Sequence, residues 1–403
     1  MIEIINMKYF TASEYLMIDI ANNYGLDKLN WEDRIKFVKD NEPELENMSK
    51  PANPCLYYTA VQAYRDYQQG KAIGYPISLD STSSGLQWLA VLTGDIAAAK
   101  LCNVYNTGKR EDSYTIIYNK FKELAGESHY KRDNIKQAIM TSLYGSKKVP
   151  KDLFGEQYYI FENLMGVLAP KCWELNKYLL DNWDSSVDEY NWVMPDNFHV
   201  TMEVEDKVKD TFTFLGTKEE FHHYEKRPIS KGKALGANLT HSVDSFALRE
   251  IVTRCSISIK RKTELIDLLD SDHSVNKDDP EYHLISDLIK HYRTSGILSS
   301  RVLLHLNTST IGLFKSKELD ELSHLITTLP KKPFKIITIH DSFRVHPNYG
   351  NDIREQYIFV MSKIAKSNLL TTLLQSIFGP DISYQKEYLD LDKDILESEY
   401  AIC

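Results

Sequence analysis

The pattern of apolar and polar positions predicts short strands at two widely separated places in the chain. Residues 335–347 alternate apolar and β-branched side chains, and the alternation is interrupted by a turn at Asp341. Residues 75–80 form another short apolar run that ends in Asp80, and a helix-like apolar stretch follows at 86–92. The chain therefore carries one acid at the turn of a predicted hairpin and a second acid at the end of a predicted strand.

Helical periodicity predicts most of the remaining structure. The first seventy residues contain three helical segments, the first opened by the capping-box pair Thr11 and Glu14. Helices are also predicted at 263–269 and 280–292, on either side of the charged loop 270–279. A helix-rich α+β class follows from this distribution.

The segment 131–145 predicts a helix with an unusual polar face. Arg132, Lys136, Met140 and Tyr144 recur at every fourth position, and Gly145 suits the end of the helix. At about 100° per residue these four side chains share one broad face. Such a stripe is usually turned to water, but Arg and Lys one turn apart can also hold a triphosphate, with Tyr beside a base or sugar.

Composition and charge limit how this chain can bind its partners. Its 403 residues are 42% hydrophobic and 26% charged, which is typical of one large or two medium globular domains. A net charge of −9 gives no overall attraction to nucleic acid, so any such binding must use local basic patches. Five scattered cysteines indicate neither disulfides nor zinc and favour a reducing cytosol. No apolar run is long enough to span a membrane.

Asp80 and Asp341 are the candidate metal ligands. Two acids on adjacent strands suit Mg²⁺, which prefers oxygen ligands and is held by one or two carboxylates together with substrate phosphates. The backbone carbonyl of Ser81 follows the first acid and is a further candidate ligand. Either Asp alone is more often a turn or cap residue, so the pair gains weight only from the basic helix between them.

Five segments in order resemble the bacteriophage-type single-subunit DNA-directed RNA polymerases, which include the mitochondrial enzymes. Residues 80–87 resemble their motif A, residues 132–145 motif B and residues 340–343 motif C. Residues 238–244 resemble the segment whose histidine lies near the ribose of the incoming nucleotide, and residues 394–401 resemble the family's C-terminal end. The resemblance runs from about Asp33 to Cys403.

The resemblance implies a role for each matching residue. Asp80 and Asp341, with Ser81, would hold two Mg²⁺ ions. Arg132 and Lys136 would bind the triphosphate, and Lys136 would also act as the general acid for pyrophosphate. The 2′-hydroxyl would be checked by Tyr144, His241 and Tyr114, while Gly85 lets nucleotide approach closely.

The resemblance also implies an architecture. The expected fold is a right-hand polymerase with a family A-like palm, built on a small antiparallel sheet, and helical fingers. The predicted divisions are a helical palm-associated region at 1–72, palm with motif A at 73–115, fingers with motif B and a specificity-like hairpin at 116–240, and the palm return with motif C at 241–403. Residues 256–332 are an insertion relative to the family.

The hairpin region at 192–238 is predicted from alternation at 200–204 and 211–215. A β-ribbon fits the DNA major groove, and the basic residues between Lys226 and Lys233 could meet phosphates. The tip is expected to carry Glu219 and Glu220, which weakens the case for direct promoter reading. A promoter-recruitment or single-stranded-DNA-binding factor is therefore an expected partner.

Because the family's N-terminal domain and thumb would precede Met1, the chain is expected to be the catalytic half of a split phage polymerase. A second polypeptide would supply the missing parts, and the bacterial host cytoplasm is the expected location. DNA template, RNA product and NTPs are the other expected partners. A truncated product of a longer gene is the alternative.

Two other functions stay open at the level of sequence. Family A DNA polymerases share the Arg–Lys helix and the His–Asp hairpin, but place Glu after the first Asp to exclude the ribose hydroxyl and an acid after the second. Here Ser84 and Gly85 follow Asp80, and Ser342 follows Asp341. A non-catalytic DNA-binding or processivity subunit with a polymerase-like fold is the second alternative. The intact acids argue against it, because paired acids repel each other without a metal and a non-catalytic fold has no need of them.

Overall fold

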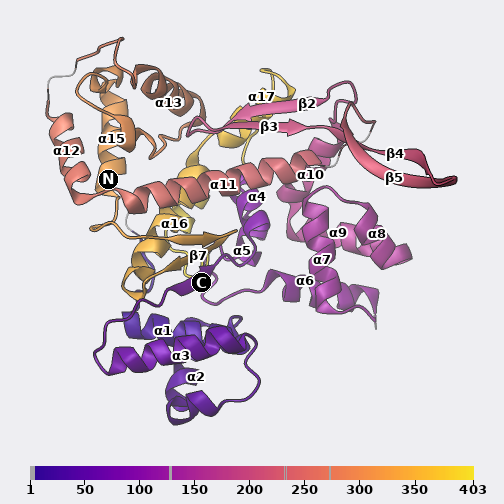
Figure 1. The fold of residues 1–403 in the computed structure, drawn as a ribbon, viewed down its shortest axis with the longest axis horizontal. Helices are drawn as coiled ribbons and strands as arrows, with labels where there is room; N and C mark the ends of the chain where they lie inside the picture. The colour runs from indigo at the N-terminus through magenta and orange to yellow at the C-terminus, as the bar shows by residue number, and fades with distance from the viewer. Residues whose placement is uncertain (1–4, 127–128, 231, 233, 272–273) are drawn as a thin grey trace.

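The computed structural model describes residues 5–126, 129–230, 232, 234–271 and 274–403. Three helices precede the first strand and pack together at the indigo end of the chain (Figure 1): α1 (Ala12–Ala21), α2 (Trp31–Asp40) and α3 (Pro54–Gln68). Thr11 Oγ1 accepts a hydrogen bond from the Glu14 amide at 3.2 Å, and Glu14 accepts one from the Thr11 amide at 2.8 Å. The predicted capping box is confirmed.

The central sheet has three antiparallel strands in the order β1 (Ile77–Asp80), β7 (Ser342–Val345) and β6 (Ile337–Ile339). Asp80 lies opposite Ser342 and Ser78 lies opposite Arg344. Because side chains alternate along a strand, Ile77, Leu79, Phe343 and Val345 point into the core, where all four are buried. The other face of the sheet is left for the site, and the predicted pairing of the two acid-bearing segments is confirmed.

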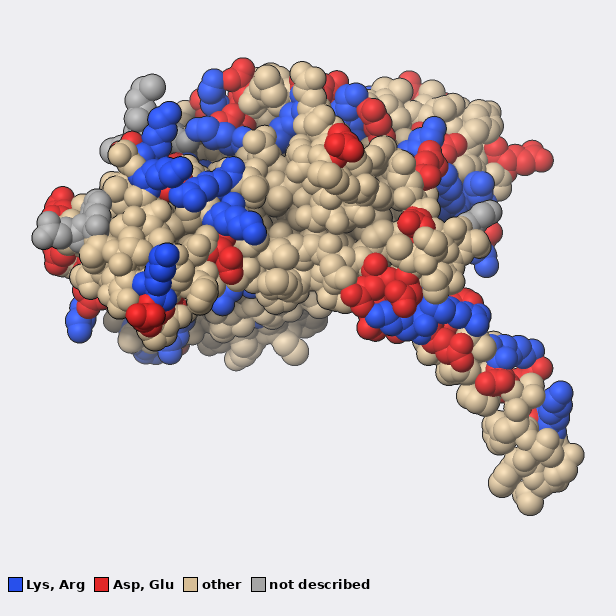
Figure 2. All heavy atoms as spheres, turned by 90° about the horizontal axis from the view of Figure 1, so that it is seen from above, with Lys and Arg blue, Asp and Glu red and all other residues tan. Residues whose placement is uncertain are grey.

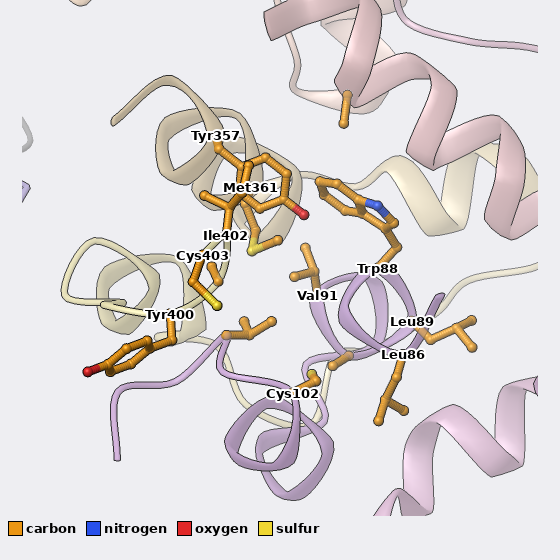
Figure 3. Packing of buried hydrophobic residues seen from close by; sticks show 14 of the residues in the cluster. Leu86, Trp88, Leu89, Val91, Cys102, Tyr357, Met361, Tyr400, Ile402 and Cys403 are labelled. Carbon is orange, nitrogen blue, oxygen red and sulfur yellow. The ribbon is translucent and has the colours of Figure 1, made fainter. Parts of the chain in front are cut away.

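Helices α4 (Ser84–Thr93), α11 (Ala234–Ser256) and α16 (Gly350–Lys366) form the core beside this sheet. Figure 3 shows side chains of α4 and α16 meeting those of the C-terminal segment, including Trp88, Met361 and Ile402. Buried Gln87 joins these parts: its Nε2 donates to the carbonyl of Ala401 at 2.8 Å, and its Oε1 accepts from the hydroxyl of Tyr357 at 3.1 Å. The start of α4 is thereby fixed directly after the first acid.

A second group of helices follows α4 in the chain, and most of it lies at the right of Figure 1. Its members are α5 (Ile96–Leu101), α6 (Ser113–Ala125), α7 (Arg132–Leu143), α8 (Lys148–Phe154), α9 (Tyr158–Leu168) and α10 (Pro170–Asp181). Helix α7 ends at the cap residue Tyr144, and Gly145 follows with φ +84°. This left-handed conformation is easy only for glycine, so the predicted helix end is confirmed.

Two hairpins follow α10. The first pairs β2 (Glu189–Val193) with β3 (His199–Glu203), and the second pairs β4 (Glu205–Phe214) with β5 (Thr217–Lys226). The second hairpin extends away from the body as an arm (Figures 1 and 2). Its turn is formed by Leu215 and Gly216, both with positive φ. The prediction that Glu219 and Glu220 occupy the tip is wrong, because both lie within β5; Lys231 and Lys233 lie outside the described residues.

The region 256–332 contains a hydrophobic cluster of its own, built from α12 (Ile259–Leu269), α13 (Tyr282–Ser295), α14 (Val302–His305) and α15 (Ser316–Thr327). The helices predicted at 263–269 and 280–292 are thus confirmed. Buried Glu250 of α11 connects this region to the core by accepting hydrogen bonds from the Ser299 hydroxyl and, at 2.8 Å, the Ser300 amide. This region is therefore joined to α11 by buried hydrogen bonds.

The remaining helical elements are short or C-terminal. They are α17 (Leu369–Phe378), α18 (Leu391–Ile395), the π-helical turn η1 (Asn22–Leu26) and the 3₁₀ turns η2 (Glu42–Asn47), η3 (Gly155–Gln157), η4 (Ile311–Leu313) and η5 (Pro347–Tyr349). Within the described part of the chain, no helix has the length and apolar character needed to cross a bilayer. The predicted helix-rich α+β class with small antiparallel sheets is confirmed.

Candidate active site

The two candidate acids lie at the same edge of the central sheet. Asp80 is the last residue of β1, and Asp341 lies in the turn between β6 and β7, where His340 adopts φ +54°. The antiparallel pairing of β1 with β7 places Asp80 opposite Ser342, next to Asp341 in the chain. Ser81 Oγ donates a hydrogen bond of 2.8 Å to Asp341 Oδ2. Strand pairing alone therefore brings the two carboxyl groups together across more than 250 residues of sequence.

Electrostatics at this edge disfavour two negative charges without a cation. The surrounding protein, and then the charge of Asp341, raise the pKa of Asp80 from 3.8 to about 6. The carboxyl group of Asp80 nevertheless opens onto a cavity, so a soluble ion can reach it. Among the described residues, neither acid forms an ion pair with Lys or Arg. A divalent cation would relieve the repulsion between them.

The donor set fits Mg²⁺. Two carboxylates face the cavity, and the carbonyl of Ser81 receives no backbone hydrogen bond among the described residues. Among all the described residues, no group of three or more His, Cys, Asp and Glu side chains is placed to hold a metal ion. All-oxygen ligation by few protein groups, completed by water or phosphate oxygens, is typical of Mg²⁺ and unlike the closed nitrogen and sulfur sites of zinc.

The C-terminal segment holds Asp80 in place. The Cys403 amide donates to the Asp80 carbonyl at 2.9 Å, and the Asp80 amide donates to the Cys403 carbonyl at 3.2 Å. Cys403 is itself buried next to the guanidinium of Arg34, whose Nη2 lies 3.8 Å from its Sγ. In Figure 1 the C-terminus accordingly lies beside β7. The C-terminal segment thus reaches the site.

A cavity of about 590 Å³ unites the predicted site residues. It is lined by Asp80, Ser81, Gly85, Tyr114, Arg132, Lys136, Met140, Tyr144 and Asp341. The acids occupy one wall, on the sheet, and the stripe of α7 occupies another. All four residues of that stripe line the cavity, as the fourfold spacing predicted. The size suits a nucleotide-sized ligand.

The structure distinguishes the two cations of α7, which the sequence treated alike. The guanidinium of Arg132 donates twice to the carboxylate of Asp112, at 2.7 and 2.9 Å, and its Nε donates to Thr115 Oγ1 at 2.8 Å. Lys136 forms no ion pair among the described residues, and its Nζ lies 5.5 Å from the ring centre of Tyr114. Lys136 is therefore the more available positive charge, while Asp112 partly neutralises Arg132.

Asp112 is a site residue that the sequence reasoning missed. Its carboxylate caps α6 by accepting from the Thr115 amide at 3.3 Å, and the same group binds Arg132 at the start of α7. The available signal was an acid two residues before Tyr114, in a position suited to a helix cap. One carboxylate thus fixes the relative positions of two helices that border the cavity.

The aromatic residues predicted to contact the sugar lie on the side of the cavity near α4. A Cβ added to Gly85 would lie 3.0 Å from the hydroxyl oxygen of Tyr144, so glycine at this position makes room for that ring. His241, on α11, has its ring centre 5.0 Å from that of Tyr144. The Tyr114 hydroxyl lies 3.1 Å from Ser83 Oγ. Tyr144 and Tyr114 line the cavity directly, and His241 contacts it through Tyr144.

Comparison with known proteins shows which family the site-bearing part of the chain resembles. The sequence model of the family described as DNA-dependent RNA polymerase matches residues 10–190, an interval that contains Asp80, Tyr114 and the whole stripe of α7. Over this interval the chain is similar to the DNA-dependent RNA polymerases, and the relatives that it resembles include mitochondrial enzymes. The resemblance predicted from the motifs is confirmed.

Three fungal proteins are similar to the chain. The mitochondrial DNA-directed RNA polymerase of Schizosaccharomyces pombe is 27% identical over 160 residues, covering 32% of the chain and 14% of the relative. That of Neurospora crassa is 23% identical over 267 residues, covering 56% and 18%. A probable DNA-directed RNA polymerase of Neurospora crassa is 25% identical over 154 residues, covering 32% and 17%. The chain thus spans less than a fifth of the length of these relatives.

Mutation of Asp80 tests the repulsion at the site without measuring activity. Because folding raises the pKa of Asp80 from 3.8 to about 6, its ionisation opposes folding above pH 6, and this cost disappears as the pH falls toward 4. In Mg²⁺-free buffer we expect Asp80→Asn to raise the Tm at pH 8, by about 2 °C after solvent screening, and to change it little at pH 4. Mg²⁺ should raise the Tm of the wild type alone. A Tm difference independent of pH would contradict the assignment.

Proposed function

We propose that this chain is the catalytic part of a DNA-directed RNA polymerase and transfers nucleotidyl groups from NTPs to the 3′ end of RNA. The observation that carries the proposal is one cavity with Asp80 and Asp341 on one wall and Lys136 on another. Paired acids suit a metal-assisted displacement at phosphorus, and a facing cation suits the triphosphate. Substrates and activity are proposed because the chain covers only part of its relatives.

The proposed mechanism assigns each wall a task. Mg²⁺ at Asp80, Asp341 and the Ser81 carbonyl would supply Lewis-acid stabilisation of charge on the phosphate oxygens. Asp80 is held by its two backbone hydrogen bonds to Cys403, so one ligand is fixed in advance. Lys136 binds the triphosphate and gives a proton to the leaving pyrophosphate. Arg132 is oriented by Asp112, and its Nη1, which lies 4.0 Å from exposed Asp133 and donates no hydrogen bond among the described residues, would give a second phosphate contact.

Selection of ribonucleotides is proposed to depend on the residues next to the two acids. Ser84 and Gly85 follow Asp80, so no carboxylate side chain blocks a 2′-hydroxyl at this point. The hydroxyl of Tyr144 lies against Gly85, and its ring is backed by His241. A ribose that enters between them would meet a hydrogen-bonding group instead of a steric block. This arrangement favours RNA synthesis over DNA synthesis.

The proposed partners are a DNA template, the RNA product and NTPs. A second polypeptide that supplies the N-terminal domain and thumb, a bacteriophage origin and a promoter-recruitment or single-stranded-DNA-binding factor stay predictions. The arm formed by β4 and β5 carries Lys207, Lys209 and Lys218 on one face, which would suit phosphates. Co-purification of the untagged partner from the source cell tests the split arrangement, and a fully active single chain would exclude it.

A primer-extension assay tests the proposed function. The wild type, alone and with any co-purifying polypeptide, should extend an RNA primer on a DNA template with Mg²⁺ and should prefer ribo- over deoxyribonucleotides. Tyr144→Phe removes one hydroxyl, so we expect the preference to fall roughly tenfold, the value of one hydrogen bond of about 1.4 kcal/mol. Phe at position 144 keeps the ring contact with His241, so His241→Asn serves as the separate test of that contact.

The outcomes separate the alternatives. Preference for deoxyribonucleotides would favour a DNA polymerase fragment. If neither the chain alone nor the assembled complex extends the primer, although both bind DNA, the result would favour a non-catalytic subunit. Neither alternative has an observation in its favour that the RNA polymerase proposal lacks.

A further inference from the structure

One cation on the acid-bearing face of the sheet has no partner. The alternation of β1 and β7 places Ser78, Asp80, Ser342 and Arg344 on the same face, opposite the buried Leu79 and Phe343. Arg344 also lines the 590 Å³ cavity. Within the described residues its guanidinium forms neither a hydrogen bond nor an ion pair, and its Nε is buried without a partner. A partly buried, unsatisfied guanidinium is costly unless a ligand completes it.

Asp19, an acid that interacts electrostatically with Arg344, already accepts several hydrogen bonds. Asp19 is buried, and it accepts hydrogen bonds from the Tyr75 hydroxyl at 2.6 Å, the Ser78 amide at 3.0 Å and Asn23 Nδ2 at 3.2 Å. Burial raises the pKa of Asp19 to about 6, and the charge of Arg344 opposes this rise only weakly. Asp19 therefore supports the sheet edge through neutral donors, and no hydrogen bond or ion pair joins it to Arg344 among the described residues.

The other cations around the cavity have different environments. Lys28 pairs with its neighbour Asp27. Arg132 is held by Asp112. Arg110 interacts with the Cys403 thiol, although its Nε and Nη1 are also buried without a hydrogen-bond partner, and it does not belong to the central sheet. Arg344 is the cation that shares a sheet face with the two acids.

The adjacent edge strand adds apolar surface on the same face. In the register of β6 with β7, Ile337 lies opposite Arg344 and Ile339 opposite Ser342. Ile337 is 54% exposed and Ile339 47% exposed, which is unusual for isoleucine in a central sheet. The open face thus presents, from β1 to β6, polar groups, a cation and then two apolar side chains. This order of polar, cationic and apolar groups across the sheet matches a nucleic-acid strand, which has phosphates on one side and sugars and bases on the other.

We propose that Arg344 binds a phosphodiester of the strand whose 3′ end lies at Asp80 and Asp341, and that Ile337 and Ile339 contact the adjoining sugars. Arg344 lies two residues beyond Ser342, or about 6.6 Å along the strand, and Ser342 is opposite Asp80. A strand with its 3′-hydroxyl at the acids must pass over this face, with an internal phosphate a short way back from the reacting end. Arg344 is a positioning residue in this assignment, and the inference rests on the proposed function.

The first test separates strand binding from nucleotide binding. Arg344→Gln should weaken the affinity for a primer–template about tenfold and reduce the salt dependence of binding by about one unit of slope, because one phosphate contact is lost. The KM for NTP at saturating primer–template should stay unchanged. Lys147→Gln removes an exposed cation that lies outside this cavity, and should leave both quantities unchanged. Equal affinity and slope for Arg344→Gln and wild type would overturn the proposal.

The second test locates the phosphate. Primers carrying one neutral methylphosphonate linkage, at the first, second or third position from the 3′ end, remove single charges from the strand. We expect one of these linkages to weaken wild-type binding and to have no further effect in Arg344→Gln. If every neutral linkage weakens primer binding by Arg344→Gln as much as it weakens binding by the wild type, the contact between Arg344 and a single phosphate is contradicted. If the wild type binds and extends no primer at all, the proposed function itself fails, and that result is distinct from a failure of the Arg344 assignment.

Discussion

Replacing Asp341 by Asn is expected to reduce nucleotide addition roughly 10³-fold or more. The side chain keeps its size and its contact with the Ser81 hydroxyl, but it loses the negative charge that would balance a divalent ion. Charge stabilisation by a catalytic metal contributes several kcal/mol to a phosphoryl displacement, and each 1.4 kcal/mol is a factor of ten. Single-turnover primer extension with Mg²⁺ measures the effect.

The matched control is Asp27→Asn, which neutralises another acid of the same cavity that lies outside the central sheet. It should extend primers at close to the wild-type rate. Cleavage of the chain by Fe²⁺ bound in place of Mg²⁺ gives a readout independent of activity: backbone cuts near positions 80 and 341 are expected in the wild type and absent in Asp341→Asn. A loss of less than tenfold in Asp341→Asn would support the non-catalytic reading instead.

The features predicted correctly are those encoded by local periodicity. Alternation around Asp341 predicted the β6–β7 hairpin, and fourfold spacing predicted that Arg132, Lys136, Met140 and Tyr144 share a face of α7, which all four do in the cavity. The pairing of β1 with β7 is a contact between distant segments, and periodicity contains no information on it. That contact was predicted from the two strand-end acids together with the basic helix between them, and the resemblance of motifs A and C to a known family supported it.

The features that sequence reasoning missed depend on distant or competing interactions. The pairing of Arg132 with Asp112 joins α6 to α7, and nothing in either helix alone requires it. The turn of the arm was misplaced because Glu219 and Glu220 are polar, whereas Leu215 and Gly216 adopt the positive φ angles that close the hairpin. Arg344 was overlooked because the alternation of a strand assigns its side chain to one face of the sheet but does not show which residues or ligands lie against that face.

The distribution of charge explains how a chain with a negative net charge could bind nucleic acid. A net charge of −9 opposes DNA at long range. Near the sheet, however, Lys136 and Arg344 are cations without carboxylate partners among the described residues, and they lie on different walls of the cavity. Figure 2 shows acidic and basic side chains interspersed over the face in view, so no single basic field covers it. Attraction is concentrated where phosphates are expected to bind.

Lys136→Ala is expected to reduce kcat/KM for NTP by roughly 10²- to 10³-fold, the usual loss when one charge-stabilising donor is removed from an active site. Arg132→Ala should cost less, because Asp112 already neutralises that guanidinium in part. Lys147→Ala is the matched control, since this exposed lysine follows α7 and lies outside the main cavity. A larger loss in Arg132→Ala than in Lys136→Ala would contradict the distinction that the structure draws between the two residues.

Lys136→Arg separates the two roles assigned to this side chain. Arginine keeps the positive charge but does not release a proton near neutral pH. If Lys136 only binds the triphosphate, Arg should restore most of kcat as well as KM. If Lys136 also protonates the leaving pyrophosphate, Arg should restore KM while kcat stays reduced, and the fall of kcat at high pH that reports the acid should disappear. Rapid-quench measurement of kcat and KM between pH 6 and pH 10 decides between these outcomes, because a purely structural role for Lys136 would leave the shape of the pH profile unchanged.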